Sequence, residues 1–276
     1  MNTDYVRSYE QLTEEEKQFA HSLYHEQSKL GKTSVRGFVK RVLEQSASEQ
    51  QNQQQQNHQV PRPLCYADKA QVELPSVSRW TRGNRLRQIL EKRRSRRIFS
   101  ATQSITLKQW SELLWFGCGV SERATAERPQ SLRTWPAAGA LYSVEVFPVV
   151  MRASELAAAI YHYDAEDHRL EVVERLSESQ SIRDLIVCDF DLSQLESFVF
   201  LSVNIKRVAE KYGERGYRFA LLEGGHVAQN ILLMCEDLNL AAVPLGGFLD
   251  NAVATRLGLP TGHSPIYAIG VGRQEN

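Results

Sequence analysis

The chain of 276 residues lacks the cysteine patterns of zinc sites and of disulfide frameworks. Its four cysteines, Cys65, Cys118, Cys188 and Cys235, are far apart and form no CxxC pair. Widely spaced single thiols are typical of reduced, buried cysteines in cytoplasmic proteins. We therefore expect free thiols, no metal site and a cytoplasmic location.

The chain also has no apolar run close to the ~20 residues that a membrane span needs. Its first residues, 1–5, lack the basic and then apolar pattern of a secretory signal. Neither sign of charge dominates, because 33 basic side chains balance 33 acidic ones. This balance gives no electrostatic argument for nucleic acid or for an anionic membrane, so we expect neither as a partner.

The glycine motifs GxGxxG and GxxxxGK[ST] of nucleotide-binding folds are missing as well. What is present is a hydrophobic content of 42%, enough for a substantial core. Residues 1–46 are expected to form a helical arm, with a capping box at 13–16 and Gly31 ending its first helix. Residues 47–77 are a glutamine-rich linker and extended arm that cannot bury enough apolar surface to order itself.

Residues 78–276 alternate between extended and helical patterns with few hairpins, which predicts one α+β domain. We expect strands at 141–151, 198–204, 240–245 and 265–271, and a hairpin within 157–173. Helices are expected within 82–99 and at 106–117, 179–187 and 250–257.

The longest helical pattern starts near Tyr217 and is preceded by Lys211 and Tyr212. It is apolar on more than one side, so we expect a buried helix. Gly224 and Gly225 interrupt it, and each glycine costs a helix ~1 kcal/mol relative to alanine. The pair indicates either close packing by a helix or a flat ligand, or a tolerated flaw.

Three further segments could bind a ligand. Residues 93–97 place four guanidinium groups and one hydroxyl together, and guanidinium forks match phosphate oxygens. A solvated basic turn or a nucleic-acid contact remain alternatives, although no second basic patch with aromatics supports the latter. The small-residue loops 136–142 and 244–248 would let the backbone approach a planar ligand, or are ordinary turns.

These segments, in this order, resemble the SagB-type dehydrogenases of the FMN-dependent nitroreductase superfamily. The matching segments are RRSRR from Arg93, PAAGALYSVEV from Pro136, YHYD from Tyr161, KYGERGYRFALLEGGHVAQN from Lys211, PLGGF from Pro244 and GVGR from Gly270. A stretch at 24–30 also looks like one that these proteins carry near their start. The resemblance implies a nitroreductase-like fold, with a mixed central sheet flanked by helices, in an intertwined homodimer that binds FMN between its subunits.

The resemblance also implies roles for individual positions. Four match the family's RRSxR flavin-binding loop: Arg93, Arg94, Ser95 and Arg97. Four match a PSAG loop that reaches the flavin of the other subunit: Pro136, Ala137, Ala138 and Gly139. Three match the loop beside the isoalloxazine, and a fourth lies near the phosphate: Leu245, Gly246, Gly247 and Arg273. Lys211 and Tyr212 match the catalytic pair of azoline dehydrogenases. Ala137 departs from the usual serine, and Ser143 replaces a common proline, which we expect only to loosen the turn.

The function that follows is two-electron oxidation of thiazoline or oxazoline rings on a ribosomally made peptide, as in antibiotic biosynthesis, with a cyclodehydratase complex as partner. Lys211 is the expected base, and burial or the nearby Arg215 and Arg218 would lower its pKa. Tyr212 could act as base or relay, or hold the ring. His226 and Asn230 lie one helical turn apart, but a metal would need a third ligand, so we expect a satisfied core histidine.

Three alternatives stay open at this point. One is an NAD(P)H-driven nitro- or quinone reductase, which would share every flavin contact. Another is an oxidase of a carrier-bound or small-molecule heterocycle. The last is a scaffold subunit of a peptide-modifying complex, with residues 1–60 as a docking arm. Residues 1–60 could instead take part in a dimer swap or in peptide recognition. The pair Lys211 and Tyr212 favours azoline oxidation.

Overall fold

A computed structural model describes residues 13, 20–31, 34–40, 71–74, 84–153, 155–177 and 182–275. Cys65, most of the expected linker and the capping box after Thr13 lie outside these residues. The described part of the chain contains no helix long and apolar enough to cross a membrane.

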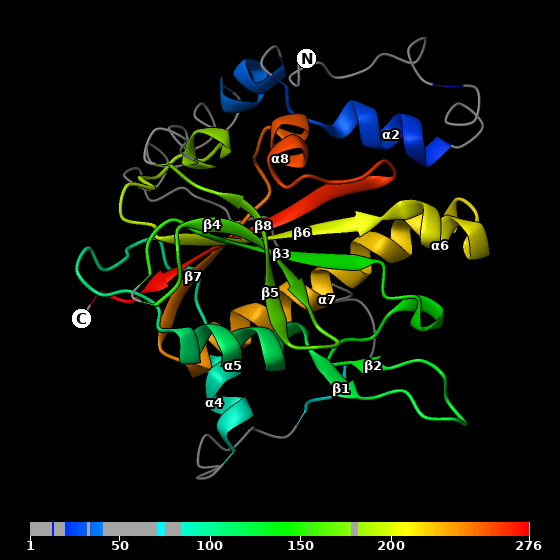
Figure 1. Ribbon diagram of the computed structural model, residues 1–276, viewed down its shortest axis with the longest axis horizontal. Coiled ribbons are helices and arrows are strands. Elements are labelled where there is room, and N and C mark those ends of the chain that lie inside the picture. The colour runs from blue at the N-terminus through cyan, green and yellow to red at the C-terminus, as the bar shows by residue number, and fades with distance from the viewer. Residues whose placement is uncertain are drawn as a thin grey trace.

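A six-stranded sheet in the order β5-β4-β3-β6-β8-β7 forms the centre of the molecule (Figure 1). Its strands are β3 (Val144–Val150), β4 (Ala159–Asp164), β5 (Arg169–Arg175), β6 (Ser197–Asn204), β7 (Leu240–Leu245) and β8 (His263–Arg273). The predicted strands and the predicted hairpin, β4 and β5, are therefore confirmed. Seven of the eight residues of β6 are buried. Its sequence is a largely apolar run because both faces of the strand are covered.

The strand directions differ from the mixed sheet that we expected, because all five neighbouring pairs are antiparallel. β6 and β7 do run in the same direction, joined by the helices α6 (Ile205–Tyr212) and α7 (Arg215–Asp237). β8 lies between them and pairs antiparallel with both, so the two parallel strands never become neighbours.

Two helices cover one face of the sheet, α7 and α5 (Leu107–Cys118) (Figure 1). α5 begins with a capping box in which Thr106 and Gln109 satisfy each other's backbone N–H groups. Its inward side chains are those expected, since Trp110, Leu113 and Leu114 are almost completely buried. These residues pack with α7 and the sheet in one apolar core.

We expected a buried helix, and within one chain α7 is buried on one side only. Leu221 and Leu222 are 38% and 54% exposed, so the helix is amphipathic. The glycine pair is divided between its two sides. A Cβ on Gly224 would lie 2.3 Å from Ile266 of β8, whereas Gly225 is exposed with nothing near its Cβ position. Close packing of the sheet therefore explains the first glycine only.

The other face of the sheet carries α8 (Asp250–Arg256), the single 3₁₀ turn η3 (Ile182–Leu185), and α2 (Ala20–Ser28) of the N-terminal arm (Figure 1). The helix expected at 179–187 is only this turn in the described residues. Residues 34–40 are helical, as predicted. The loop 119–135 contains the short strands β1 (Val120–Glu122) and β2 (Leu132–Arg133).

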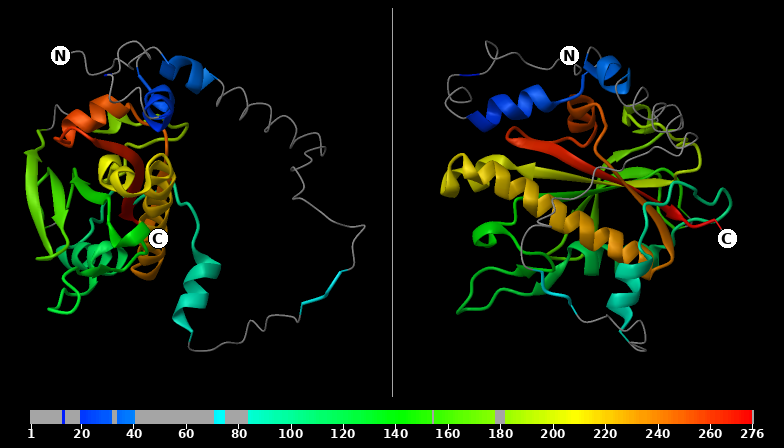
Figure 2. Two further views of the ribbon diagram at one scale, coloured as in Figure 1. Left: turned by 90° about the vertical axis from the view of Figure 1, so that its right-hand side faces the viewer. Right: turned by 180° about the vertical axis from the view of Figure 1, so that it is seen from behind.

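α4 (Arg85–Lys92) stands at the edge of the molecule, and none of its residues is buried (Figure 2). Its Leu86 and Leu90 are 58% and 52% exposed. Arg85 forms an ion pair with Asp237 at the end of α7, which fixes where the helix meets the body. The basic loop 93–97 follows α4, as predicted.

Candidate functional site

Gly139, in the 3₁₀ turn η2 (Ala138–Ala140), lies directly against Lys211 and Tyr212. Its φ of 58° is left-handed, and a Cβ there would lie 2.5 Å from Tyr212 Oη and 2.7 Å from Lys211 Nζ. Only glycine fits this position without displacing the two side chains. The structure thus brings together two of the predicted segments, the small-residue loop and the Lys-Tyr pair.

Helix α6 presents this pair at its last turn. Asn204 caps its start by accepting a hydrogen bond from the Arg207 N–H. The Tyr212 ring meets Phe219 of α7 edge to face, with ring centroids 5.1 Å apart. The Lys211 amine lies 5.4 Å from the Tyr212 ring centroid, within cation–π range. Lys211 is exposed, so the burial expected of it is not found within one chain.

Glu223 is a buried carboxylate that the sequence analysis missed. It accepts hydrogen bonds from Trp135 Nε1 at 3.1 Å and from the Val144 N–H at 3.2 Å. Ser143 donates to it twice, from its N–H at 3.2 Å and from its hydroxyl at 2.8 Å. Ser143 therefore does more than loosen the turn, because its hydroxyl helps to tie the loop to α7. The sequence signal that could have revealed Glu223 is a single acid within the apolar middle part of α7.

Side chains from the next turns of α7 contact the backbone at residues 134–136, where the small-residue loop begins. The ring of His226 is exposed, not part of the core as expected, and its Nδ1 lies 3.3 Å from the Pro136 carbonyl oxygen. Asn230 donates to the Thr134 carbonyl at 3.1 Å. Both residues of this i, i+4 pair thus position the backbone of residues 134–136. No group of three His, Cys, Asp or Glu in the described residues could hold a metal ion.

A small, mostly apolar cavity of about 170 Å³ lies between this loop and α7. It is lined by Pro136, Ala137, Ala138, Phe219, Leu222, Glu223 and His226. Ala137 contributes a methyl group, which keeps this wall apolar. Leu222, on its rim, is 54% exposed.

The basic loop divides into one paired arginine and three without acidic partners. Arg96 lies 3.1 Å from Glu236, and its N–H donates to the Ala242 carbonyl of β7. Among the described residues, no carboxylate pairs with the remaining three, Arg93, Arg94 and Arg97; Ser95 is half-buried between them.

Leu245 ends the same edge strand, β7, and Gly246 and Gly247 follow it directly. A Cβ on Gly247 would lie 2.3 Å from the Val187 carbonyl oxygen, while Gly246 is exposed with open space around it. Ala242 and Leu245 are about 10 Å apart by the rise of a strand. Arg273 ends β8 beside Ser100 and donates to Gln103 at 3.2 Å. The basic loop and Arg273 thus lie near the first half of β7, and Gly246 follows its end.

The predicted residues therefore form two groups that one chain does not unite. The basic loop lies at the last turn of α7, where Arg96 meets Glu236, and the Lys-Tyr pair precedes its first turn. A helix of 23 residues is about 34 Å long. α4 and α6 accordingly lie at opposite ends of α7 (Figure 2).

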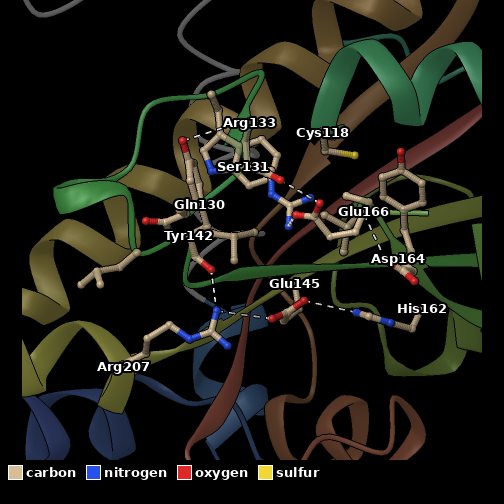
Figure 3. A pocket seen from close by; sticks show the side chains of 16 residues that line it. Cys118, Gln130, Ser131, Arg133, Tyr142, Glu145, His162, Asp164, Glu166 and Arg207 are labelled. Carbon is tan, nitrogen blue, oxygen red and sulfur yellow. Dashed lines mark hydrogen bonds and ion pairs between the residues drawn. The ribbon is translucent and has the colours of Figure 1, made fainter. Parts of the chain in front are cut away.

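A larger polar cavity of about 240 Å³ lies behind the loop 130–142 (Figure 3). None of the residues predicted for the site lines it. Its charged groups pair with one another: Arg133 lies 3.0 Å from Glu166, and Glu145 lies 3.7 Å from Arg207 and 3.2 Å from His162. Because its wall already satisfies most of its own charges, we do not assign it a ligand.

The histidine of this wall bridges two carboxylates. His162 lies 3.2 Å from Glu145 and 3.0 Å from Glu171, and the hydrogen bond with Glu145 raises its pKa most. Burial lowers the pKa of His263, at the start of β8. The described cysteines, Cys118, Cys188 and Cys235, are free. Burial raises the pKa of all three, so they are poor nucleophiles.

Comparison with known proteins agrees with this fold. The Nitroreductase family profile matches residues 90–273. A protein of Methanocaldococcus jannaschii, assigned by its name to the nitroreductases, is 28% identical over 210 residues, which cover 75% of this chain and 98% of that protein. The microcin B17-processing protein McbC of Escherichia coli is 31% identical over 134 residues, 46% of this chain and 48% of McbC.

Among solved structures, the E. coli microcin synthetase McbBCD complex with truncated pro-MccB17 bound contains a similar chain. The TM-score is 0.61 at 20% identity, with 79% of this chain and 80% of that chain covered. This likeness concerns the fold alone. The family match, in contrast, spans two thirds of the sequence and includes every predicted site residue. The chain therefore belongs to the nitroreductase family.

Proposed function

We propose that this nitroreductase-family oxidoreductase is an FMN-dependent azoline dehydrogenase acting on thiazoline or oxazoline rings of a ribosomally made peptide. One observation carries the proposal: the amine of Lys211 and the phenol of Tyr212 lie together against Gly139 of the PAAG loop. A generic reductase needs no such pair of proton-transfer groups. Similarity to a protein named for processing microcin B17 supports a peptide substrate. The partner that we propose is a cyclodehydratase complex.

The active form is a homodimer whose sites combine the two groups of residues. Apolar side chains lie exposed on α4 and α7, with Leu86, Leu90 and Leu222 each more than half exposed. A second copy of the chain would bury such faces. In an antiparallel arrangement of two α7 helices, the Lys-Tyr end of one chain meets the basic-loop end of the other.

The residues on the β7 side fit FMN. Arg93, Arg94 and Arg97 lack acidic partners in the described part of the chain, as a phosphate site requires. Gly246 leaves its backbone open to the edge or face of a flat ring. When bound there, the flavin supplies a hydride acceptor, which oxygen can restore.

The protein's own part is to remove a proton. Converting an azoline to an azole takes one hydride and one proton from adjacent ring atoms. Lys211 Nζ would accept that proton, and Tyr212 Oη would orient the ring or relay the proton to water. The apolar wall formed by Ala137, Ala138 and Phe219 would exclude water from the ring.

The test is oxidation of a purified azoline-bearing peptide in the presence of oxygen, followed by mass spectrometry. Lys211→Ala and Tyr212→Phe are expected to keep flavin-loaded dimers but to lose at least ~100-fold of the rate. Lys206→Ala is the control, because Lys206 is exposed on the same helix. Wild-type rates in both Lys211→Ala and Tyr212→Phe would contradict the proposed role of the pair. Rapid bleaching of the flavin by NADPH, without azole formation, would instead identify a nitro- or quinone reductase.

A further inference from the structure

The segment from Gly139 to Tyr142 holds a strained backbone beside the Lys-Tyr pair. Three of its four residues are left-handed: Gly139 with φ 58°, Ala140 with φ 54° and Tyr142 with φ 45°. For a residue with a Cβ this conformation costs ~1–2 kcal/mol. Strain of this kind persists only where surrounding groups hold the backbone in place.

Two side chains from outside the segment hold its strained residues. The Gln130 amide donates a hydrogen bond to the Ala140 carbonyl, and Arg207 Nη1 donates to the Tyr142 carbonyl at 2.7 Å. Each donor thus fixes the peptide that follows one left-handed residue. The Tyr142 hydroxyl is held as well, because it accepts the Arg133 N–H at 3.2 Å.

Arg207 links this segment to the helix that carries the pair. It lies four residues before Lys211, and residues at i and i+4 share one face of a helix. α6 therefore contacts the strained segment twice, through Arg207 and, one turn later, where Lys211 meets Gly139. Glu145, 3.7 Å from Arg207, steadies the guanidinium from the sheet (Figure 3).

We propose that Arg207 and Gln130 are positioning residues that keep the segment 139–142 closed on Lys211 and Tyr212, and so fix the direction of the amine and the phenol. The inference rests on the proposed function of that pair. Without these donors the strained residues would relax toward right-handed conformations and Gly139 would move away. The flexible Lys211 side chain would then gain rotamers, and a displacement of about 1 Å is enough to cost a large factor in rate.

The kinetic test uses the full-length, flavin-loaded protein. Arg207→Gln and Gln130→Ala are expected to lower kcat for azoline oxidation at least ~tenfold, with KM and flavin content unchanged. Arg207→Lys keeps a cation able to donate a hydrogen bond and is expected to recover most of the rate. Gln130 is exposed on a loop, so its replacement does not endanger folding. Arg169→Gln is the matched control, since Arg169 is exposed and its ion pairs lie within the β4–β5 hairpin.

A second readout needs no peptide substrate. Lys206 and Lys211 are both exposed on α6, so their rates of chemical acetylation can be compared by mass spectrometry in one sample. The ratio of Lys211 to Lys206 acetylation is expected to rise several-fold in the Arg207→Gln and Gln130→Ala proteins, and to stay unchanged in Arg169→Gln. A ratio at the wild-type value in both variants overturns the inference, whatever their activity. A changed ratio in a protein that oxidises no azoline supports positioning and rejects the proposed reaction.

Discussion

Gly139 is the residue whose identity the geometry restricts most. Its backbone is left-handed, and the side chains of Lys211 and Tyr212, which we propose to be catalytic, occupy the space that a Cβ would need. The first property is shared by Gly262, whose φ is 88° and whose Cβ position is empty. Comparing the two glycines therefore separates the cost of backbone strain from the effect on the Lys-Tyr pair.

Gly139→Ala and Gly262→Ala are both expected to lower the free energy of unfolding by about 1–2 kcal/mol, because alanine resists a left-handed backbone. Only Gly139→Ala is expected to lose activity, by at least ~tenfold, since its methyl group displaces Lys211 and Tyr212. Denaturant titration and azole formation measure the two effects. Equal activities of the two variants would show that the contact has no catalytic consequence.

Single residues differed in how visible they were from the sequence. Lys211 and Gly139 stand in motifs, and the structure places them in contact. Glu223 escaped notice because one acid in an apolar helix looks like an interruption, and its four donors come from residues about 80 positions away. Arg207 was missed because its nearest partner is a backbone carbonyl, which no side-chain pattern reveals.

At the scale of elements, the N-terminal arm joins two parts of the fold that border the proposed site. His25 of α2 lies 3.4 Å from the Tyr217 hydroxyl in the first turn of α7. Leu30 donates its N–H to the Asp250 carboxylate at 2.8 Å, at the start of α8. The described part of the arm thus packs on its own chain. Burial raises the pKa of Asp250 to about 6, so ionising this anchor weakens the folded state.

Asp250→Asn is expected to stabilise the protein increasingly as pH rises. The folded-state pKa lies above the unfolded value of 3.8, so stability from the protonated acid is lost as pH passes through about 6. The neutral amide escapes this loss and still accepts the Leu30 N–H. The difference in unfolding free energy should grow by roughly 1–1.5 kcal/mol between about pH 5 and pH 8. Asp184→Asn, at an exposed acid, is the control. A flat difference for Asp250→Asn would contradict the assignment.

Secondary structure was largely predictable because periodicity is local. The hairpin, α5 and the apolar strand β6 follow directly from their patterns. The position of β8 between β6 and β7 could not be predicted from the sequence. Strand order depends on which sheet edge a late segment of the chain reaches. The same non-local effect turned the expected mixed sheet into an antiparallel one.

At the scale of the whole molecule, the proposed dimer depends on the exposed face of α7. Leu222→Asp is expected to give monomers that retain no flavin, since a charge would be buried at the contact. Val172→Asp is the control, because Val172 is 51% exposed on the edge strand β5, compared with 54% for Leu222. Light scattering and flavin absorbance after gel filtration report the result. A flavin-loaded Leu222→Asp dimer would place the contact elsewhere.

α7 separates the basic loop from the Lys-Tyr pair by roughly 34 Å. This separation also determines how an inactivating substitution in one chain affects the two catalytic centres of the proposed dimer. Each chain would lend one half to either of two catalytic centres. Chains crippled in opposite halves, when allowed to exchange, would therefore complement each other: half of the pairs formed are hybrids, and every hybrid holds one intact centre beside one doubly defective centre. About a quarter of the wild-type centres would reappear from two inactive parents.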